Sequence, residues 1–194
     1  MTAISRESLL TLEAYAKQRK EFRSRVLAHK KNRILQIGAN VILIFEDELT
    51  VRYQVQEMLR IEKTFEEQGI RDELDAYNPL IPDGSNLKAT MMIEYEDPDE
   101  RSHALARLIG IESRVYMQVD GTDRCYAIAD EDLPRENEEK TSSVHFLRFE
   151  FPSRAIAAFR EGRSVAVGID HPNYQARVDE IAAEVQGSLA RDFT

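Results

Sequence analysis

The chain has 194 residues, of which 42% are hydrophobic and 31% charged, and its formal net charge is −9. This composition is typical of an ordinary globular protein and excludes a disordered one. No apolar run reaches the 18 residues of a membrane span, and the N-terminal residues lack the apolar core and cleavage site of a signal peptide. The single cysteine, Cys125, excludes an internal disulfide and a cysteine-rich zinc site. We therefore expect one cytoplasmic domain over residues 1–194, with Cys125 as a packed free thiol.

The charge is distributed unevenly. Residues 1–33 hold nine Lys or Arg against three Glu, whereas the rest of the chain is strongly acidic. A basic segment beside an acidic body usually packs against that body or against a second copy. We therefore expect residues 1–32 to form a basic N-terminal helical segment and the protein to be a homodimer. Nucleic-acid binding through residues 17–33 is a weaker alternative, because the acidic whole repels nucleic acid and the segment lacks interleaved aromatic residues.

The first half of the chain combines helical and alternating apolar periods. The run VILIF at 41–45 is short enough to be a strand buried on both faces, and the glycine-containing loop before it predicts a hairpin. Thr50 is a plausible N-cap for a helix that ends at Gly69. The expected elements are a helix at 8–31, hairpin strands at 33–37 and 41–45, helices at 50–69 and 70–77, and a strand at 87–96.

In the second half, Asp97 and Pro98 give the clearest helix start, and Asp120-Gly121 predicts a hairpin. The expected elements are a helix at 97–110, strands at 114–119 and 124–129, a loop at 130–140, a strand at 141–151, a helix capped by Ser153 to 162, a strand at 164–169 and a helix at 174–193. This order predicts an α+β fold with a mostly antiparallel or mixed sheet of about seven strands and about five helices packed on it. Residues 152–194 would form a helix–strand–helix extension.

The helix expected at 50–69 carries polar residues within its apolar stripe. Gln54 and Glu62 lie there, and burying either without a partner costs several kcal/mol. We expect Gln54 to bond to backbone and Glu62 to pair with an arginine as a structural tie, and Arg148 on the strand at 141–151 to pair with Glu62 or Glu94. A ligand or metal role for Glu62 remains an alternative, as does a position at the edge of the stripe in contact with water.

Polar residues are concentrated among otherwise apolar elements, which favours a Glu/Arg/His pocket as an alternative site. Its candidate residues are Gln54, Glu57, Arg60, Glu62, Tyr77, Asn78, Glu94, His145 and Arg148. Within this set, His145 is either a satisfied core histidine or a ligand or proton carrier near Glu94. The catalytic residues, if any exist, are not specified by the sequence.

Known catalytic and cofactor motifs are missing. The sequence has no Walker loop, no GxGxxG and no GxSxG. A single Glu-x-x-His, formed by Glu100 and His103, falls in the first turn of a short helix, where we expect it to be solvated, because a di-iron bundle needs two such motifs. We expect His171 to bond to loop backbone and His29 to lie on the surface. We expect no metal and no cofactor.

Four segments, YQVQEMLRIEK, ELDAYNPLIP, LKATMMIEYED and SSVHFLRFEF, resemble the bacterial domain of unknown function family 3501. The resemblance covers most of residues 5–151. Residues 170–174 look like part of an extension beyond that region. The residues that carry its central block are Gln54, Gln56, Glu57, Met58, Leu59, Arg60, Glu62, Tyr77, Asn78 and Pro79. The resemblance implies no activity, but it implies partners, since genes of this family lie beside rubrerythrin-like proteins and iron–sulfur oxidoreductases.

We therefore expect a non-catalytic accessory or interaction protein of a redox or oxidative-stress system. The chain itself has neither CxxC pairs nor paired Glu-x-x-His, so it does not resemble those redox proteins. The alternative is a small-molecule-binding domain or an enzyme with the Glu/Arg/His pocket, and nucleic-acid binding is third.

Overall fold

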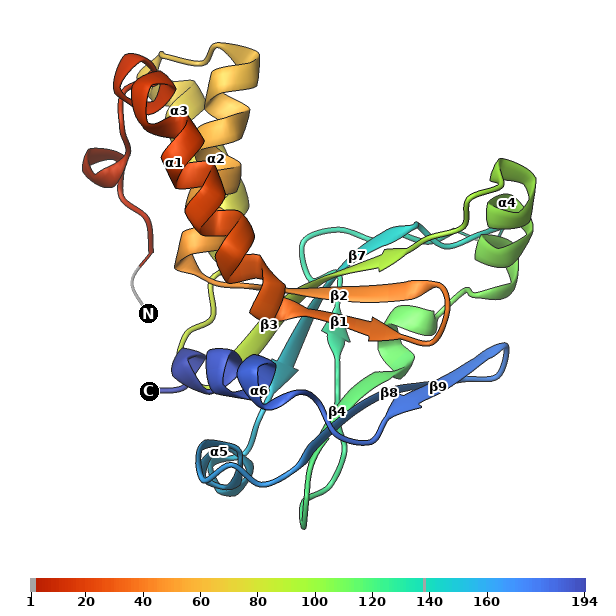
Figure 1. Cartoon of the computed structure of the whole chain (residues 1–194). Helices are drawn as coiled ribbons and strands as arrows, with labels where there is room; N and C mark the ends of the chain where they lie inside the picture. The colour runs from red at the N-terminus through yellow and green to blue at the C-terminus, as the bar shows by residue number, and fades with distance from the viewer. Residues whose placement is uncertain (1–2, 138) are drawn as a thin grey trace.

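Two antiparallel sheets face each other in this computed structural model, which describes residues 3–137 and 139–194, and a helical arm rises from one side of the first sheet (Figure 1). The first sheet has the order β1 (Ile34–Ile37), β2 (Val41–Glu46), β3 (Asn86–Ile93), β7 (Val144–Glu150) and β6 (Ile128–Ala129). The second has the order β5 (Cys125–Tyr126), β4 (Val115–Val119), β8 (Val165–His171) and β9 (Tyr174–Val178). The α+β class is confirmed, but the described residues form nine strands in two sheets rather than about seven in one.

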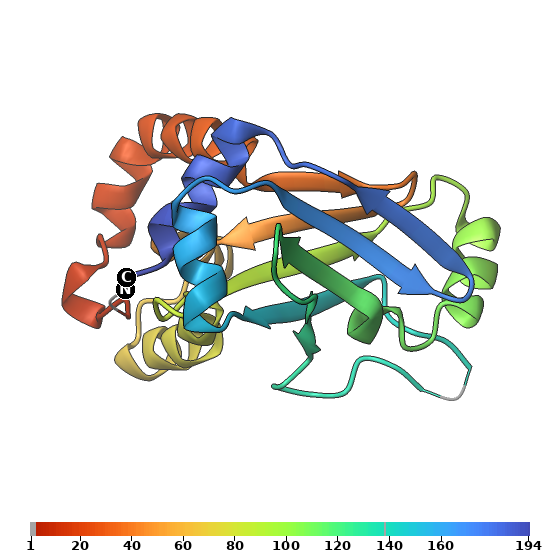
Figure 2. The same cartoon turned by 90° about the horizontal axis from the view of Figure 1, so that it is seen from below.

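The main core lies between the two sheets. Alternate side chains of the central strands point into it, including Leu43, Met91 and Met117, which are fully buried. The outward side chains of the first sheet are only half-buried, so β2 is not buried on both faces as predicted. Helices close the two ends of this core, α4 (Pro98–Arg107) at one end and α5 (Ser153–Arg160) with α6 (Ala183–Leu189) at the other (Figure 2).

The helical arm consists of α1 (Leu12–Lys30), α2 (Glu48–Glu62) and α3 (Glu67–Tyr77). It has a separate small core, made by Ile4, Leu9, Val51, Val55, Leu59, Ile70, Leu74 and Ile81. Helix α1 buries only Tyr15 and Val26, and its remaining surface is largely polar. Short 3-10 turns complete the described helices, at Arg6–Ser8, Lys31–Arg33, Asn78–Leu80, Ile111–Arg114 and Ala190–Asp192.

The limits of α2 differ from the prediction. Asp47, not Thr50, is the N-cap, and Thr50 is the third helical residue. The two form a capping box, in which the side chain of each accepts a hydrogen bond from the backbone N–H of the other. The helix ends at Glu62 because Lys63 adopts a left-handed conformation with φ 55°. Gly69 therefore lies inside α3. Similarly, the residue that caps α5 is Pro152 rather than Ser153.

The predicted helix at 174–193 is wrong, whereas the helix after Ser153 and the strand at 164–169 are found as α5 (Ser153–Arg160) and β8 (Val165–His171). Residues 174–178 form β9, which pairs with β8 in the register Val167↔Val178 to His171↔Tyr174, and the last helix is short. Strand β8 lies inside the second sheet between β4 and β9, so residues 152–194 are not a helix–strand–helix extension but complete the body. Tyr174 also joins the sheets, because its hydroxyl donates to the Ile37 carbonyl at 2.6 Å.

Residues 125–129 pass from one sheet to the other. The hairpin at Asp120-Gly121 is confirmed, with Met117 opposite Cys125, but the chain then leaves β4 and pairs with β7, placing Ile128 opposite Arg148. This crossing separates the predicted strand at 124–129 into β5 and β6.

None of the helices in the described ranges is long and apolar enough to span a membrane.

Candidate functional site

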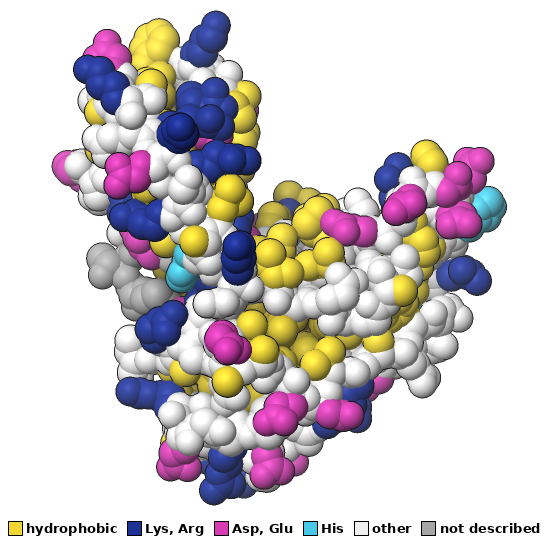
Figure 3. All heavy atoms as spheres, in the orientation of Figure 1, with side chains coloured by type: hydrophobic (Ala, Val, Ile, Leu, Met, Phe, Trp, Pro, Cys, Tyr) yellow, Lys and Arg dark blue, Asp and Glu magenta, His cyan; other side chains and the backbone are white. Residues whose placement is uncertain are grey.

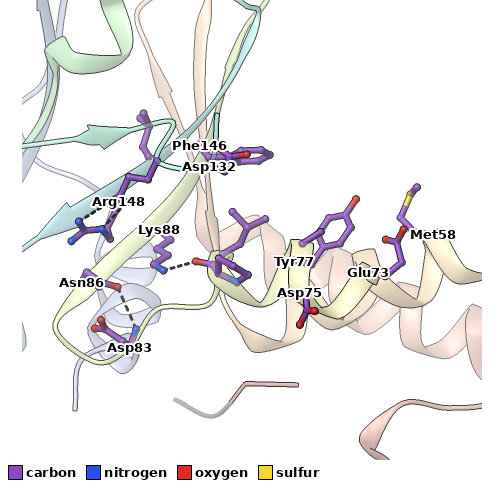
Figure 4. Close-up of a pocket in the computed structure, with 15 residues that line it drawn as sticks. Met58, Glu73, Asp75, Tyr77, Asp83, Asn86, Lys88, Asp132, Phe146 and Arg148 are labelled. Atoms are coloured by element: carbon purple, nitrogen blue, oxygen red, sulfur yellow. Dashed lines mark hydrogen bonds and ion pairs between the residues drawn. The ribbon is translucent and has the colours of Figure 1, made fainter. Parts of the chain in front are cut away.

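A cleft of about 920 Å³ lies between the arm and the outer face of the first sheet. Its walls come from α2, α3 and the loop after α3, and its floor comes from β3 and β7 (Figure 4). Figure 3 shows from one side that the molecule is hollowed between arm and body, with hydrophobic side chains exposed on the floor of the hollow. Its lining includes Met58, Glu73, Tyr77, Leu80, Lys88, Phe146 and Arg148.

The strand period places the floor residues. Alternate residues of β3 and β7 point away from the main core, and the pairing Thr90↔Phe146 sets Lys88 directly opposite Arg148 one step along. Two like charges directly opposite each other destabilise a sheet unless other groups neutralise them. The surroundings of these two cations therefore decide what the floor can bind.

Arg148 is fully engaged. It pairs with Glu131 through Nε and Nη2, both at 2.8 Å, and donates from Nη1 to Glu150 at 2.5 Å. These hydrogen bonds raise the pKa of the guanidinium above its ordinary value. The predicted partners of Arg148 are wrong, because Glu62 and Glu94 are both exposed and neither pairs with it.

Lys88 has a different environment. Its ammonium donates to the Pro79 carbonyl, and among the described residues it makes no ion pair with a carboxylate. Burial lowers the pKa of this amine below its ordinary value, with nearby Asp83 opposing that shift. The floor thus contains one neutralised cation and one without a paired anion.

The helical wall supplies Met58, Glu73 and Tyr77, whose side chains are separated from the two floor cations in Figure 4. Burial raises the pKa of the Glu73 carboxyl, and the neighbouring Glu62 and Asp72 add to the shift. Burial also raises the pKa of the Tyr77 phenol, with contributions from Glu73 and Glu62. In both groups burial thus disfavours the charged form.

The nine residues predicted for one pocket are not gathered in one place. Only Tyr77 and Arg148 line the cleft. Gln54 donates to the Glu46 carboxylate at 3.3 Å rather than to backbone, and Asn78 exchanges two hydrogen bonds with the backbone of Ile4. Glu62 is the last residue of α2 and is exposed. This position agrees with the predicted alternative in which Glu62 lies at the edge of the apolar stripe.

Glu57 and Arg60 belong to a polar cluster within the arm. The Glu57 carboxylate accepts from the Tyr15 hydroxyl at 2.7 Å, from Arg19 Nε and Nη2 at 2.7 and 2.8 Å, and from Arg60. These partners, led by Arg19, lower the pKa of Glu57 to about 2. The cluster ties α1 to α2 and leaves no lone pair directed at the cleft.

His145 is a fully buried histidine on the inner face of β7. Its Nδ1 lies 2.6 Å from Asp130 Oδ2, and its Nε2 lies 3.0 Å from both Thr141 Oγ1 and the Ser142 carbonyl. Of the two predicted alternatives it is therefore the satisfied core histidine, and Glu94 is not among its hydrogen-bond partners. A second carboxylate, Glu112, approaches Nε2 at 4.0 Å, and burial raises the pKa of this acid.

The other histidines have structural surroundings. His29 was expected on the surface, but it is half-buried with Nε2 2.5 Å from Asp47 Oδ2. His171 contacts the Ile109 backbone carbonyl at 3.1 Å, which confirms its predicted contact with loop backbone. Glu100 and His103 are exposed, as expected for a solvated helix start.

Metal and thiol chemistry have little support. In residues 3–137 and 139–194, no group of three or more His, Cys, Asp or Glu is placed to hold a metal ion. The Cys125 thiol donates to the Glu150 carbonyl at 3.0 Å, and burial raises the pKa of this thiol to about 11. The thiolate needed for nucleophilic or redox chemistry is therefore scarce at neutral pH.

Sequence reasoning missed Lys88, Glu73, Met58 and Phe146. A signal for Lys88 was available, since a lysine stands in the middle of an alternating strand, on the same face as Thr90 and Met92. Its importance depends on the arm that covers it, and the packing of the arm on the sheet is a long-range feature.

Comparison with known proteins places the chain in a family. The model of the family described as protein of unknown function (DUF3501) matches residues 3–193. The chain belongs to this family. The match includes the C-terminal residues, beyond the 5–151 of the sequence resemblance. A crystal structure of a protein of unknown function from Burkholderia pseudomallei K96243 is similar to the chain, with 55% identity, a TM-score of 0.95 and 100% of each chain covered. Among proteins with curated functions, none matches the chain.

Proposed function

We propose that this protein binds a small molecule in the cleft between the arm and the first sheet. The observation that carries the proposal is the cleft itself, whose volume of about 920 Å³ falls within the range typical of ligand sites. Apolar side chains such as Leu80 and Phe146 line it together with charged and polar groups, Lys88 and Tyr77 among them. Such a lining buries an apolar ligand while the polar groups fix its orientation.

The test is a metabolite screen by thermal shift, followed by calorimetric titration of each hit on the wild type and two variants. Phe146→Ala removes the aromatic floor of the cleft and should weaken binding about tenfold or more. Ile44→Ala is the matched control, because Ile44 is a half-buried apolar residue on the same sheet face that does not line the cleft. Equal affinities in the two variants, or the absence of any hit, would contradict ligand binding in this cleft.

We propose as a second candidate an accessory role through the tip of the arm. Ile61 and Phe65 are 60% and 73% exposed there, and adjacent large apolar residues on a surface favour protein contact. The family resemblance suggests a rubrerythrin-like or iron–sulfur protein as partner, and the charge pattern suggests a second copy.

Sedimentation velocity tests both partners of the tip. The chain is measured alone and mixed with a purified rubrerythrin-like or iron–sulfur protein, and a Phe65→Ser variant should lose whichever complex forms. A monomer that binds neither protein would contradict the accessory role without affecting the cleft.

A further inference from the structure

We propose that the ligand of the cleft is an amphipathic monoanion, an apolar chain with one carboxylate or similar head, and that Lys88 binds the head. This inference rests on the proposed ligand-binding function and specifies the class of ligand. It concerns only the side chains that line the cleft.

Lys88 is the cation of the cleft that lacks a paired anion. Its neighbour Arg148 already makes a two-point contact with Glu131 at 2.8 Å and a further contact with Glu150. Lys88 donates to one neutral carbonyl, that of Pro79 (Figure 4). A half-buried ammonium with a single neutral acceptor gains from an anionic partner, so the head of an anion is expected at Lys88.

Five acids line the cleft, and most of them are already committed elsewhere. Glu131 pairs with Arg148, and Asp132 pairs with Arg135 at 2.5 and 2.7 Å. Asp83 accepts from the Ser85 amide and hydroxyl, both at 2.9 Å.

Two acids remain, and neither competes for the head. Asp75 is exposed and lies on the opposite side of α3 from Tyr77 in Figure 4. Glu73 lies on the helical wall near Met58, on the far side of Tyr77 from Lys88 in Figure 4. Although five acidic residues line the cleft, it is therefore not a cation site.

The apolar part of the ligand is defined by what surrounds Lys88. Phe146 lies on the floor, Leu80 follows α3, and Met58 and Tyr77 extend the lining along the helices. A flexible thioether and two aromatic rings suit an unbranched or ring-containing hydrocarbon chain of variable shape. A head at the floor cation and a tail along the helical wall together describe an amphipathic acid.

The experiment compares three probes with one tail and different heads, namely dodecanoate, dodecanol and dodecylammonium, titrated calorimetrically below their aggregation concentrations. We expect dodecanoate to bind at least tenfold more tightly than the other two. In Lys88→Met, dodecanoate should lose about tenfold in affinity while dodecanol is unchanged, and Lys88→Arg should retain the preference for the acid. Lys20→Met is the control, because it removes an equal charge from an exposed position on α1.

The outcomes separate this inference from the proposed function. Equal binding of the three probes, tightest binding of dodecylammonium, or an unchanged preference in Lys88→Met would overturn the anion site while leaving ligand binding intact. No binding by any probe would overturn the anion inference, and the metabolite screen with Phe146→Ala decides the proposed function independently. Circular dichroism and the unfolding temperature of each variant establish that it is folded.

Discussion

The helical arm and the two-sheet body are stabilised in different ways. Thirty apolar residues share the buried core of the body, and only eight share that of the arm. The arm instead depends on polar contacts between its helices, such as the three partners of Glu57 and the exchange of hydrogen bonds between Gln56 and the Leu10 backbone. Because hydrogen bonds contribute less net stability than a large apolar core, we expect the arm to open before the body.

This difference in stability affects the cleft, because the cleft has its floor in the body and its helical wall in the arm. Its floor belongs to the body and stays fixed, whereas its helical wall belongs to the arm, where local opening costs less free energy. Any rearrangement of the cleft is therefore expected in the arm rather than in the sheets. The following substitutions measure how independent the two regions are, from the largest expected effect to the smallest.

Arg33→Met should destabilise both regions together, by about 3–5 kcal/mol, because it removes one partner from buried ion pairs. Arg33 is 1% exposed at the base of the arm, where it donates to the Phe45 and Glu46 carbonyls, each at 2.9 Å, and pairs with Asp192. The measurement is the urea midpoint at unchanged m value. A loss below about 1 kcal/mol would show that this tie does not join the regions.

The double variant Arg33→Met with Asp192→Leu is the control for the charge left behind. Replacing both partners by apolar side chains removes the uncompensated carboxylate, so about 1 kcal/mol or more of stability should return. If the double variant regains no stability, the loss in Arg33→Met comes from the backbone carbonyls to which Arg33 donates.

Glu57→Gln should destabilise the arm by about 2 kcal/mol at pH 7, because the amide keeps the shape but loses the charge that Arg19 contacts. Hydrogen exchange should accelerate in α1 and α2 and remain unchanged in the two sheets. The pKa of Glu57 is lowered in the folded state from its ordinary value of 4.5 to about 2. Its contribution is therefore complete above about pH 5 and is lost as the pH falls toward 2.

The difference in stability between the wild type and Glu57→Gln should accordingly close between about pH 5 and pH 2. Glu13→Gln changes an exposed carboxylate on α1 and serves as the control. A pH-independent difference, or faster exchange throughout the body, would contradict a charge effect confined to the arm.

Lys63→Gly should stabilise the arm by about 0.5–1 kcal/mol, because Lys63 holds the left-handed turn after α2 at φ 55°, which glycine adopts without strain. The unfolding temperature should rise by a few degrees. Lys20→Gly, in the interior of α1, should instead destabilise by about 1 kcal/mol. A decrease in stability of Lys63→Gly would show that its side chain, rather than the turn, is important.

The sequence predicts the local features of this fold well. The cap of α4 at Asp97, the turn at Asp120-Gly121 and the hairpin of β1 and β2 are confirmed, because each depends on neighbouring residues. The prediction of a helix at 174–193 is wrong because of tertiary structure. Val178, Ile181 and Val185 have helical spacing, but residues 174–178 are taken up by the free edge of β8.

The candidate site was only partly predictable, for a similar reason. Tyr77 and Arg148 were named and do line the cleft, but the acid that neutralises Arg148 is Glu131, one of many acids in the chain. Glu62 was assigned to the buried stripe because α2 was expected to continue to Gly69. The left-handed turn at Lys63 ends the helix and leaves Glu62 in water.

The interleaving of the two sheets along the chain has a consequence for folding kinetics. Strands β1 and β2 form a local hairpin, but β4 must wait for β8, whose Val165 pairs with Val119 across a long intervening segment. Pairings between distant residues form slowly, on the order of milliseconds to seconds. During synthesis on the ribosome, β4 emerges with only the two-residue β5 as its partner, so its apolar face stays exposed until the C-terminal strands follow.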